Sequence, residues 1–463
     1  MRNPKNTNAP QAPATLSKRM PFPVTTVGSW PRSPELLRAL KARRLGRSSE
    51  EEFSAVADRA VLDFLHIQET AGLDIVTDGE QRRDNFFNFV ADRLDGVRML
   101  SLAEMLDHVE DKAGYEEILR TMDVPAFAMF NPIAVGRIAR RKPLASHEYS
   151  FLKRHTDRPI KVTLPGPYLL TRAMWLQGVS EDPYPTKEHL ADDVVTILRE
   201  ELSELRELGA DFIQFDEPVL SELVFSSRVS SRVFMCASLS IRNTPTEELE
   251  LAVDLVNRVV NGVQREEGQR IGLHVCRGNW STQEDVLLRG PYGLLMPYLE
   301  RMNIDQLVLE YATPRAGELA DMQGTRKELG LGVVNPRTGD AETPEAIVER
   351  AREALLYLPP EQIFLNPDCG FGTFANRPLN SIATAESKLS SMVRAAEMLR
   401  NGAARCRGHL SELLLSETFQ LIYVSHTVLA WAGPHTSNIE GTTSVGLIRT
   451  NKGHRPRPVS LVF

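Results

Sequence analysis

Eight short apolar runs, each separated from the next by a longer segment, constrain the fold of this chain more than any other feature. Continuous apolar runs of this length that alternate with helical segments are typical of buried parallel strands covered by helices. Eight such strands in 463 residues favour an α/β fold of the (β/α)8 TIM-barrel type over a doubly wound sheet. No glycine-rich phosphate motif follows any run, which also argues against the doubly wound alternative. The runs lie near residues 23, 73, 159, 210, 270, 304, 329 and 361.

The segments between the runs carry the signals of helices. In residues 187–210, apolar side chains recur three and four positions apart, and the pattern stops at a glycine. Residues 343–362 begin with Thr343 as a candidate N-cap and Pro344 at the first helical position, and they end at prolines. We therefore expect a helix after most of the strands.

The chain divides into three predicted parts. Residues 1–20 lack the apolar core of a signal peptide, and we expect a disordered N-terminal segment. Residues 21–402 form the predicted barrel, with an insertion after strand two, over residues 86–155, that we expect to be helical and to cap the mouth. Residues 403–463 form a C-terminal extension of uncertain structure.

The apolar stretch 413–433 in that extension is a poor membrane span. It contains Glu417, Gln420 and His426, which are costly in a lipid bilayer. We expect an amphipathic helix that lies on the domain or on a partner chain.

Charge and cysteine content narrow the class of protein. The net charge of −7 gives no reason to expect nucleic acid or a membrane surface as a partner. Four scattered cysteines are too few for the disulfide framework of a secreted protein, so we expect a cytoplasmic location, with thiols that are metal ligands, catalytic groups or core residues. The sequence predicts no oligomeric state. The cysteines are Cys236, Cys276, Cys369 and Cys406.

Polar residues follow most of the predicted strands, at the end where a TIM barrel carries its chemistry. Because the loops at that end converge on one mouth, we expect these side chains to lie close together. In strand order they are Gly28 and Ser29, Asp78 and Glu80, Asp216 and Glu217, His274 and Cys276, Glu310, Asn335 and Arg337, and Asp368 and Cys369.

Four of these residues suit a zinc ion: His274, Cys276, Glu310 and Cys369. Residues two apart on a strand share a face, so His274 and Cys276 can point into one cavity. Two thiolates, an imidazole and a carboxylate match the ligands of tetrahedral Zn²⁺, and the carboxylate is the ligand that a substrate would displace. A single cysteine in an apolar strand is usually a core residue. Candidate ligands at the ends of three neighbouring strands favour a metal site instead.

The acidic strand ends predict a site for an amino group. Asp78, Glu80, Asp216 and Glu217 could each be a helix cap or a surface charge, yet carboxylates gathered around one mouth can bind an ammonium ion. The Gly28–Ser29 pair could be a simple turn, and its backbone N–H groups could equally hold a carboxylate.

At these residues the sequence resembles the C-terminal catalytic barrel of cobalamin-independent methionine synthase and its single-barrel relatives, over roughly residues 21–400. The matching stretches are "TTVGSWPR", "LDIVTDGEQRRD", "LPGPYLL", "GADFIQFDEPVLSE", "HVC", "LVLEYA" and "NPDCGFGT". The resemblance implies a zinc-dependent methyltransferase of methionine biosynthesis, which moves a methyl group from N5 of a methylated folate to homocysteine. It implies His274, Cys276, Glu310 and Cys369 as zinc ligands and, as residues that hold the amino-acid thiol, Val27, Gly28, Ser29, Glu80, Asp216 and Glu222.

The sequence departs from the family pattern around the methyl donor. The loop after strand seven has Asn335 and Arg337 where the long enzymes carry a histidine acid, and the folate-stacking tryptophan has no match, although Trp175 lies near its position. The N-terminal barrel of the long enzymes has no counterpart. The donor could therefore be a methylated folate, another alkyl donor or a methylated corrinoid protein. The candidate catalytic residues are Asp216, Glu80 and Arg337.

Two other functions remain open at this stage. One is the chemistry of epoxyalkane:coenzyme M transferase, in which a zinc-bound thiol attacks another electrophile and Arg337 would suit a sulfonate. The other is a non-catalytic barrel stabilised by zinc. Structural zinc sites are closed and usually richer in cysteine, so a glutamate ligand among other carboxylates favours a reactive site.

Overall fold

The computed structural model describes residues 20–108, 112, 116, 129–225, 243–266, 268–375, 377–415, 423–424 and 427–428. The expected disordered segment therefore lies, apart from Met20, outside the described residues, as does Cys236. By its internal contacts the chain divides into two compact units, residues 1–396 and residues 397–463.

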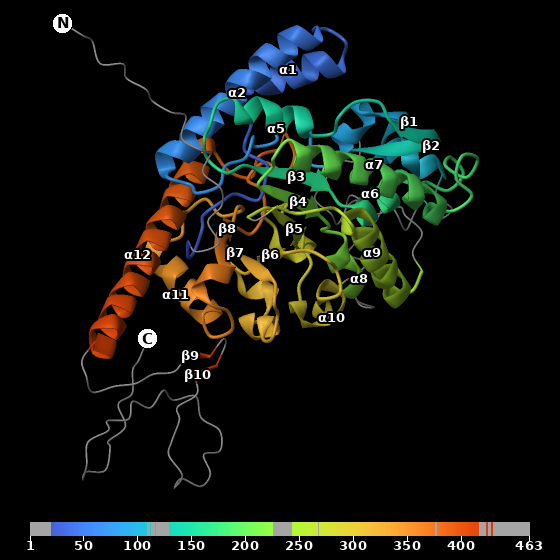
Figure 1. The fold of residues 1–463 in the computed structure, drawn as a ribbon. Helices are drawn as coiled ribbons and strands as arrows, with labels where there is room; N and C mark the ends of the chain where they lie inside the picture. The colour runs from blue at the N-terminus through green and yellow to red at the C-terminus, as the bar shows by residue number, and fades with distance from the viewer. Residues whose placement is uncertain are drawn as a thin grey trace, which may run out of the picture. The chain divides into compact units, whose positions relative to one another are not determined.

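A parallel sheet forms the centre of the first unit (Figure 1), with its strands in sequence order. Two further segments complete the ring, because Val24 bridges to Leu365 on β8 and Val76 bridges to Ile160 beside β3, both in parallel. The N–H of Ile75 donates to the carbonyl of Val24 at 3.2 Å, which joins these two segments. All eight apolar runs thus take part, and the predicted (β/α)8 barrel is confirmed. The sheet strands are β3 Lys161–Pro165, β4 Phe212–Asp216, β5 Arg270–Val275, β6 Gln306–Glu310, β7 Glu328–Val334 and β8 Ile363–Pro367.

Helices surround the strands (Figure 1), and several begin with the caps that the sequence predicts. The hydroxyl of Thr343 accepts the N–H of Ala346 at 3.2 Å at the start of α11. Ser49 and Thr244 form capping boxes at the starts of α2 and α9. The α-helices are α1 Pro34–Arg44, α2 Glu50–Ala71, α3 Leu102–Met105, α5 Ser146–Lys153, α6 Pro167–Met174, α7 Lys187–Glu207, α8 Leu220–Phe225, α9 Pro245–Val260, α10 Met296–Leu299, α11 Pro344–Ala354 and α12 Ile382–Leu415. The 3₁₀ turns are η1 Asn88–Asp92, η2 Leu106–His108, η4 Glu284–Val286, η5 Tyr292–Leu294, η6 Pro314–Ala316, η7 Leu319–Met322 and η8 Pro360–Gln362.

The strand register brings the polar strand ends to one level. Asp216 on β4 is paired with Pro165 on β3 and with His274 on β5. Below this level an apolar cluster fills the barrel, and burying each of its larger side chains stabilises the fold by about 1.5–3 kcal/mol. The cluster consists of Val27, Ile75, Phe212, Val308 and Phe364.

The insertion after the second strand differs from the expectation. Its described part is built on the antiparallel strands β1 Leu94–Ser101 and β2 Phe130–Arg140, together with the helices α3 and α5 and the 3₁₀ turns η1 and η2. The expectation of an insertion made of helices is therefore wrong for β1 and β2, which are strands. A bulge at Gly96 has φ +74°, and a Cβ there would lie 2.3 Å from the carbonyl oxygen of Arg137. Only glycine allows the two strands to approach so closely.

The second unit contains the end of α12 and two short antiparallel strands, β9 Tyr423–Val424 and β10 Thr427–Val428. Of the residues described within 413–433, residues 413–415 belong to α12 and the other four form these strands, so the expected amphipathic helix is wrong only for the four strand residues. The remaining residues, with Glu417 and His426, lie outside the description. Among the described helices, none is long and apolar enough to cross a membrane.

Candidate active site

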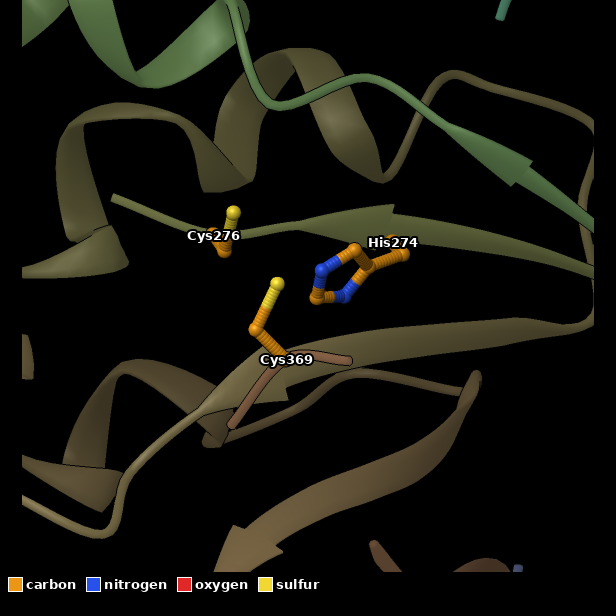
Figure 2. Close-up of side chains that lie close together, drawn as sticks. All are labelled: His274, Cys276 and Cys369. Carbon is orange, nitrogen blue, oxygen red and sulfur yellow. The ribbon is translucent and has the colours of Figure 1, made fainter. Parts of the chain in front are cut away.

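Three of the four predicted metal ligands lie together at the carboxyl end of the barrel. The Nδ1 or Nε2 atom of His274 and the Sγ atoms of Cys276 and Cys369 all lie within 4.8 Å of one another (Figure 2). His274 and Cys276 come from the end of β5, whereas Cys369 follows β8. Residues far apart in the chain thus form a group that can hold a metal ion.

The imidazole of His274 is oriented for metal binding. Its side chain is buried, and Nδ1 lies 3.1 Å from the carbonyl oxygen of Val308 on β6. A carbonyl accepts only from a donor, so this contact assigns a proton to Nδ1 and makes Nε2 the nitrogen that a metal ion would bind in place of a proton. Nε2 has no hydrogen-bond partner within the described part of the chain. A buried nitrogen of this kind suits a metal ligand.

The two thiols influence each other's ionisation. A hydrogen bond from the Cys369 thiol lowers the pKa of Cys276, and the His274 imidazole adds to this effect against the cost of burial. The same hydrogen bond, together with burial, raises the pKa of Cys369. Both cysteines are free thiols. Because the thiolate is the form that binds metals, Cys276 is the better prepared of the two.

Glu310, the fourth predicted ligand, is held by other partners. It is the last residue of β6, and its Oε2 atom accepts a hydrogen bond from Asn279 at 2.9 Å. Its Oε1 atom lies 3.1 Å from Arg315 and 3.6 Å from Arg277. Burial would raise the pKa of this carboxyl, but the two guanidinium groups lower it, so the carboxylate form is favoured. The structure therefore does not bring Glu310 into the three-residue group.

A cavity with an empty volume of about 490 Å³ opens beside the thiols. Eight of the predicted site residues line it: Val27, Gly28, Ser29, Glu80, Asp216, His274, Cys276 and Cys369. Sequence reasoning missed the others: Phe86, Pro218, Asn279, Trp280, Gly370, Thr373 and Phe374. For Asn279 and Trp280 there was a signal, since they come shortly after the His-x-Cys stretch. Phe86 and Phe374 come from loops and carried none.

Glu80 is held in place in an unusual backbone conformation. It has φ +53°, which a residue with a side chain rarely adopts and which is common at functional sites. The hydroxyl of Thr163 donates to its Oε1 atom at 2.9 Å, whereas Oε2 is buried and has no hydrogen-bond partner among the residues described. Burial raises the pKa of this carboxyl, and the Arg83 and Arg32 guanidinium groups oppose the shift. An ammonium group in the cavity would satisfy the Oε2 atom.

Gly28 allows the strand-one turn to approach this carboxylate. A Cβ atom at this position would lie 2.4 Å from Oε1 of Glu80 and 3.1 Å from Cγ2 of Thr163. A side chain here would force the carboxylate or the turn to move, so glycine lets the Val27–Ser29 turn line the cavity directly.

Asp216 supplies a second buried carboxylate. The side-chain amide of Gln214 donates to its Oδ1 atom at 2.8 Å. Burial raises the pKa of Asp216 to about 7, and the nearby His274 imidazole limits the shift. Burial lowers the pKa of His274 in turn, but the Cys276 sulfur and the Asp216 carboxylate outweigh this effect and raise it to about 9. The metal-ligand group and the carboxylates thus form one electrostatic unit.

Besides Glu310, other predicted residues lie outside the cavity lining, among them Asp78, Asn335 and Asp368. Glu222 on α8 is buried 3.6 Å from Arg172. Arg337 donates from Nε to the side-chain oxygen of Asn279 at 3.0 Å and forms an ion pair with Glu284. Glu217 accepts the N–H groups of Tyr168 at 2.7 Å and Leu169 at 2.9 Å, so it caps α6.

Trp175 is also outside this lining. Its indole N–H donates to the carbonyl of Tyr184 at 3.0 Å. The tryptophan beside the thiols is Trp280 instead.

Comparisons with known proteins identify the family to which the chain is similar. Residues 22–398 match the family described as the cobalamin-independent synthase, catalytic domain. A methionine synthase of Thermococcus kodakarensis is 32% identical over 387 residues, which cover 83% of this chain and 95% of the relative. A methionine synthase of Pyrococcus abyssi is 31% identical over 382 residues, which cover 82% of this chain and 93% of the relative.

Solved structures share the fold. A B12-independent methionine synthase from Shewanella sp. W3-18-1, in complex with selenomethionine, superposes with a TM-score of 0.62 at 23% identity and covers 83% of this chain and 99% of that one. A putative vitamin-B12-independent methionine synthase from Listeria monocytogenes has a TM-score of 0.57 at 21% identity. The match covers 82% of this chain and 98% of that one.

Proposed function

Because the chain belongs to the family of cobalamin-independent methionine synthases, we propose that it is a methyltransferase that methylates the sulfur of homocysteine and forms methionine. The observation that carries this function is the shared cavity, in which two buried carboxylates and two thiols beside an imidazole face the same space. A thiol amino acid needs both the carboxylates and the metal-ligand group of such a site. The carboxylates recognise its ammonium group, and the metal-ligand group receives its sulfur.

Zinc is the metal that we propose for this site. The donors fit it, since an imidazole with a free Nε2 atom and two thiols are ligands of Zn²⁺. His274, Cys276 and Cys369 would hold the ion, and a substrate thiol coordinated to zinc would have a lowered pKa, so that it would be present as the nucleophilic thiolate at neutral pH. Glu310 is the fourth ligand in this proposal, and its carboxylate would leave Arg315 and Asn279 to take that place.

The other polar groups of the cavity bind and orient the amino acid. Oε2 of Glu80, which is buried and unpartnered among the described residues, would accept the substrate ammonium together with the carboxylate of Asp216. Backbone N–H groups of the Val27–Ser29 turn would bind its carboxylate. Because Asp216 is paired with His274 in the sheet and both line the cavity, an amino acid held there would have its thiol close to the metal-ligand group. The buried surroundings exclude water from the reacting sulfur.

A methylated folate is the donor that we propose. Phe86, Trp280 and Phe374 give the cavity an aromatic wall, against which a flat heteroaromatic ring can stack. Arg337 does not suit the role of proton donor to the leaving nitrogen. Its guanidinium is engaged by Glu284 and Asn279.

The coenzyme M alternative depended on Arg337 as a cation at the mouth that would bind a sulfonate. Its pairing with Glu284 and its position outside the cavity lining remove that support. The purely structural zinc site is disfavoured by the cavity, because a closed site needs no space for a substrate.

Incubation of the zinc-loaded protein with 5-methyltetrahydrofolate and either homocysteine or coenzyme M tests the proposal. We expect methionine to form from homocysteine and little methylation of coenzyme M. A Cys276→Ala variant, which lacks one thiol, is the matched control and should be inactive. Equal or faster methylation of coenzyme M would overturn the proposed acceptor, and no transfer from the folate would overturn the proposed donor.

A further inference from the structure

A buried lysine lies in the barrel beneath the cavity, and its described hydrogen bonds go to a carbonyl and an amide. Lys161 on β3 is 1% exposed, and its Nζ atom donates to the carbonyl of Thr26 at 2.6 Å and to Oε1 of Gln214 at 3.2 Å. The ammonium also lies 4.8 Å from the centre of the Phe212 ring. Burying an ammonium is costly, so its retention here calls for a specific role.

Gln214 carries the lysine's influence to two parts of the candidate site. Its Oε1 atom accepts from Lys161, so the amide nitrogen Nε2 must face the other way. That nitrogen donates to Oδ1 of Asp216 at 2.8 Å and to the carbonyl of Val27 at 3.1 Å. Without the lysine, the amide could rotate and present its oxygen to the carboxylate.

The contacts of these two side chains join the strand-one turn to the acidic end of β4. Thr26 and Val27 are held through their carbonyls, and Asp216 is held through its carboxylate. Gln214 is fully buried, and none of the five residues is more than 5% exposed. The turn and the carboxylate are the elements proposed above to bind the two ends of an amino acid.

We propose that Lys161 and Gln214 are positioning residues that set the spacing between the carboxylate-binding turn and Asp216, and so select thiols that are α-amino acids. This inference rests on the proposed function. It adds that the selection is made by two residues outside the cavity lining. Burial also lowers the pKa of Lys161 to about 7, and the Asp216 carboxylate opposes this shift, so the two groups are electrostatically linked.

The test compares homocysteine with 1-propanethiol, which lacks both the ammonium and the carboxylate, in methyl transfer by the zinc-loaded protein. The quantity measured is the ratio of kcat/KM for the two thiols. In Lys161→Met the new side chain is similar in length to lysine but carries no charge. In Gln214→Met the lysine is kept and the amide is removed. We expect each variant to lower the ratio by about tenfold, mainly through a higher KM for homocysteine, because hydrogen bonds to charged groups are worth this much.

A second buried lysine provides the matched control. Lys388 donates to Thr338 at 3.0 Å and pairs with Glu342 at 3.0 Å, away from the cavity lining. Lys388→Met should lower the thermal stability but leave the ratio unchanged. In an Asp216→Asn background, Lys161→Met should lower the ratio much less than it does alone, because the two changes act on one interaction.

The outcomes separate this inference from the proposed function. If the unmodified protein itself prefers homocysteine no more than 1-propanethiol, the proposed acceptor is wrong. If it does prefer homocysteine, and Lys161→Met or Gln214→Met folds and keeps that preference or slows both thiols equally, the positioning role is overturned. Should Lys161→Met not fold, Gln214→Met decides by the same ratio.

Discussion

The Oε1 atom of Glu310 lies 3.1 Å from the Nη2 atom of Arg315, so the predicted carboxylate ligand of the metal is held in a buried ion pair. Arg315 cannot easily follow a moving carboxylate, because its Nη1 atom donates to the carbonyl of Gly278 at 3.2 Å. Arg277 is anchored in the same way, by hydrogen bonds to the carbonyls of Gly290 and Ala316. In the proposed zinc site, Glu310 would therefore have two competing positions, one beside the arginines and one on the metal.

This competition predicts a gain of metal affinity when an arginine is removed. Arg315→Met should increase the affinity for zinc in the absence of a thiol substrate by about tenfold, because Glu310 then gives up less on moving to the ion. Competition with a chromophoric chelator measures this affinity. Glu310→Gln is the control and should lower it. Unchanged or weaker zinc binding in Arg315→Met would contradict the competing position.

The thiols themselves should be essential for metal binding and dispensable for folding. We expect Cys276→Ala and Cys369→Ala each to lose stoichiometric zinc while the circular dichroism of the barrel stays the same. Cys406→Ala, which changes a cysteine outside the predicted ligand set, should keep its metal. Elemental analysis of the purified proteins is the measurement. Full zinc content in both ligand variants would show that the metal binds elsewhere.

The parts of this site that depend on local sequence patterns could be predicted, and the parts that depend on contacts between distant residues could not. The strands and the positions of His274, Cys276 and Cys369 depend on local patterns, namely apolar runs and the polar residues directly after them. The arginines around Glu310 could not be predicted, because their positions are set by backbone carbonyls well separated from them along the chain. The same holds for the pairing of Arg337 with Glu284, which moved a predicted site residue away from the cavity.

The insertion and the barrel interior show the same limit. In β2 the neighbouring apolar residues Ile133 and Ala134 are both buried and Val135 is exposed, so apolar and polar residues do not alternate and the pattern did not separate strand from helix. Lys161 and Gln214 were visible in the sequence as polar residues within apolar strands. The hydrogen bonds that lead from Lys161 through Gln214 to Asp216 depend on the register of β3 against β4.

Asp216 should make the recognition of amino-acid thiols depend on pH. Burial raises the pKa of its carboxyl to about 7, and only the ionised form attracts an ammonium group. The ionised fraction grows as the pH rises through about 7, so KM for homocysteine should fall relative to KM for 1-propanethiol over that range. The ratio of the two KM values is the quantity to follow, because any effect of pH on the metal that is common to both thiols cancels in it.

Asp216→Asn is the matching variant for this pH dependence. It should raise KM for homocysteine far more than KM for 1-propanethiol and abolish the change of their ratio with pH, because an amide does not titrate. A ratio that still varies with pH in Asp216→Asn would assign the effect to another group, and equal losses for both thiols would remove the ammonium-binding role.

The last prediction concerns the contact between Gly28 and Glu80. In Gly28→Ala the new methyl group would lie 2.4 Å from Oε1 of Glu80, so either the carboxylate or the turn must move. Glu80 is tied to Thr163 by a 2.9 Å hydrogen bond and has a backbone with positive φ, which leaves it little freedom to yield. Overpacking of this kind costs about 1–3 kcal/mol, and we expect at least a tenfold loss of kcat/KM for homocysteine.

The control for this variant is Gly339→Ala. A Cβ atom at Gly339 has no neighbour within 4 Å, and the backbone there is not left-handed. The same chemical change should leave activity and thermal stability as they are. If Gly28→Ala retains full activity with homocysteine while zinc stays bound, then the turn and Glu80 do not jointly hold the amino acid. The ammonium site would in that case have to be built from Asp216 without Glu80.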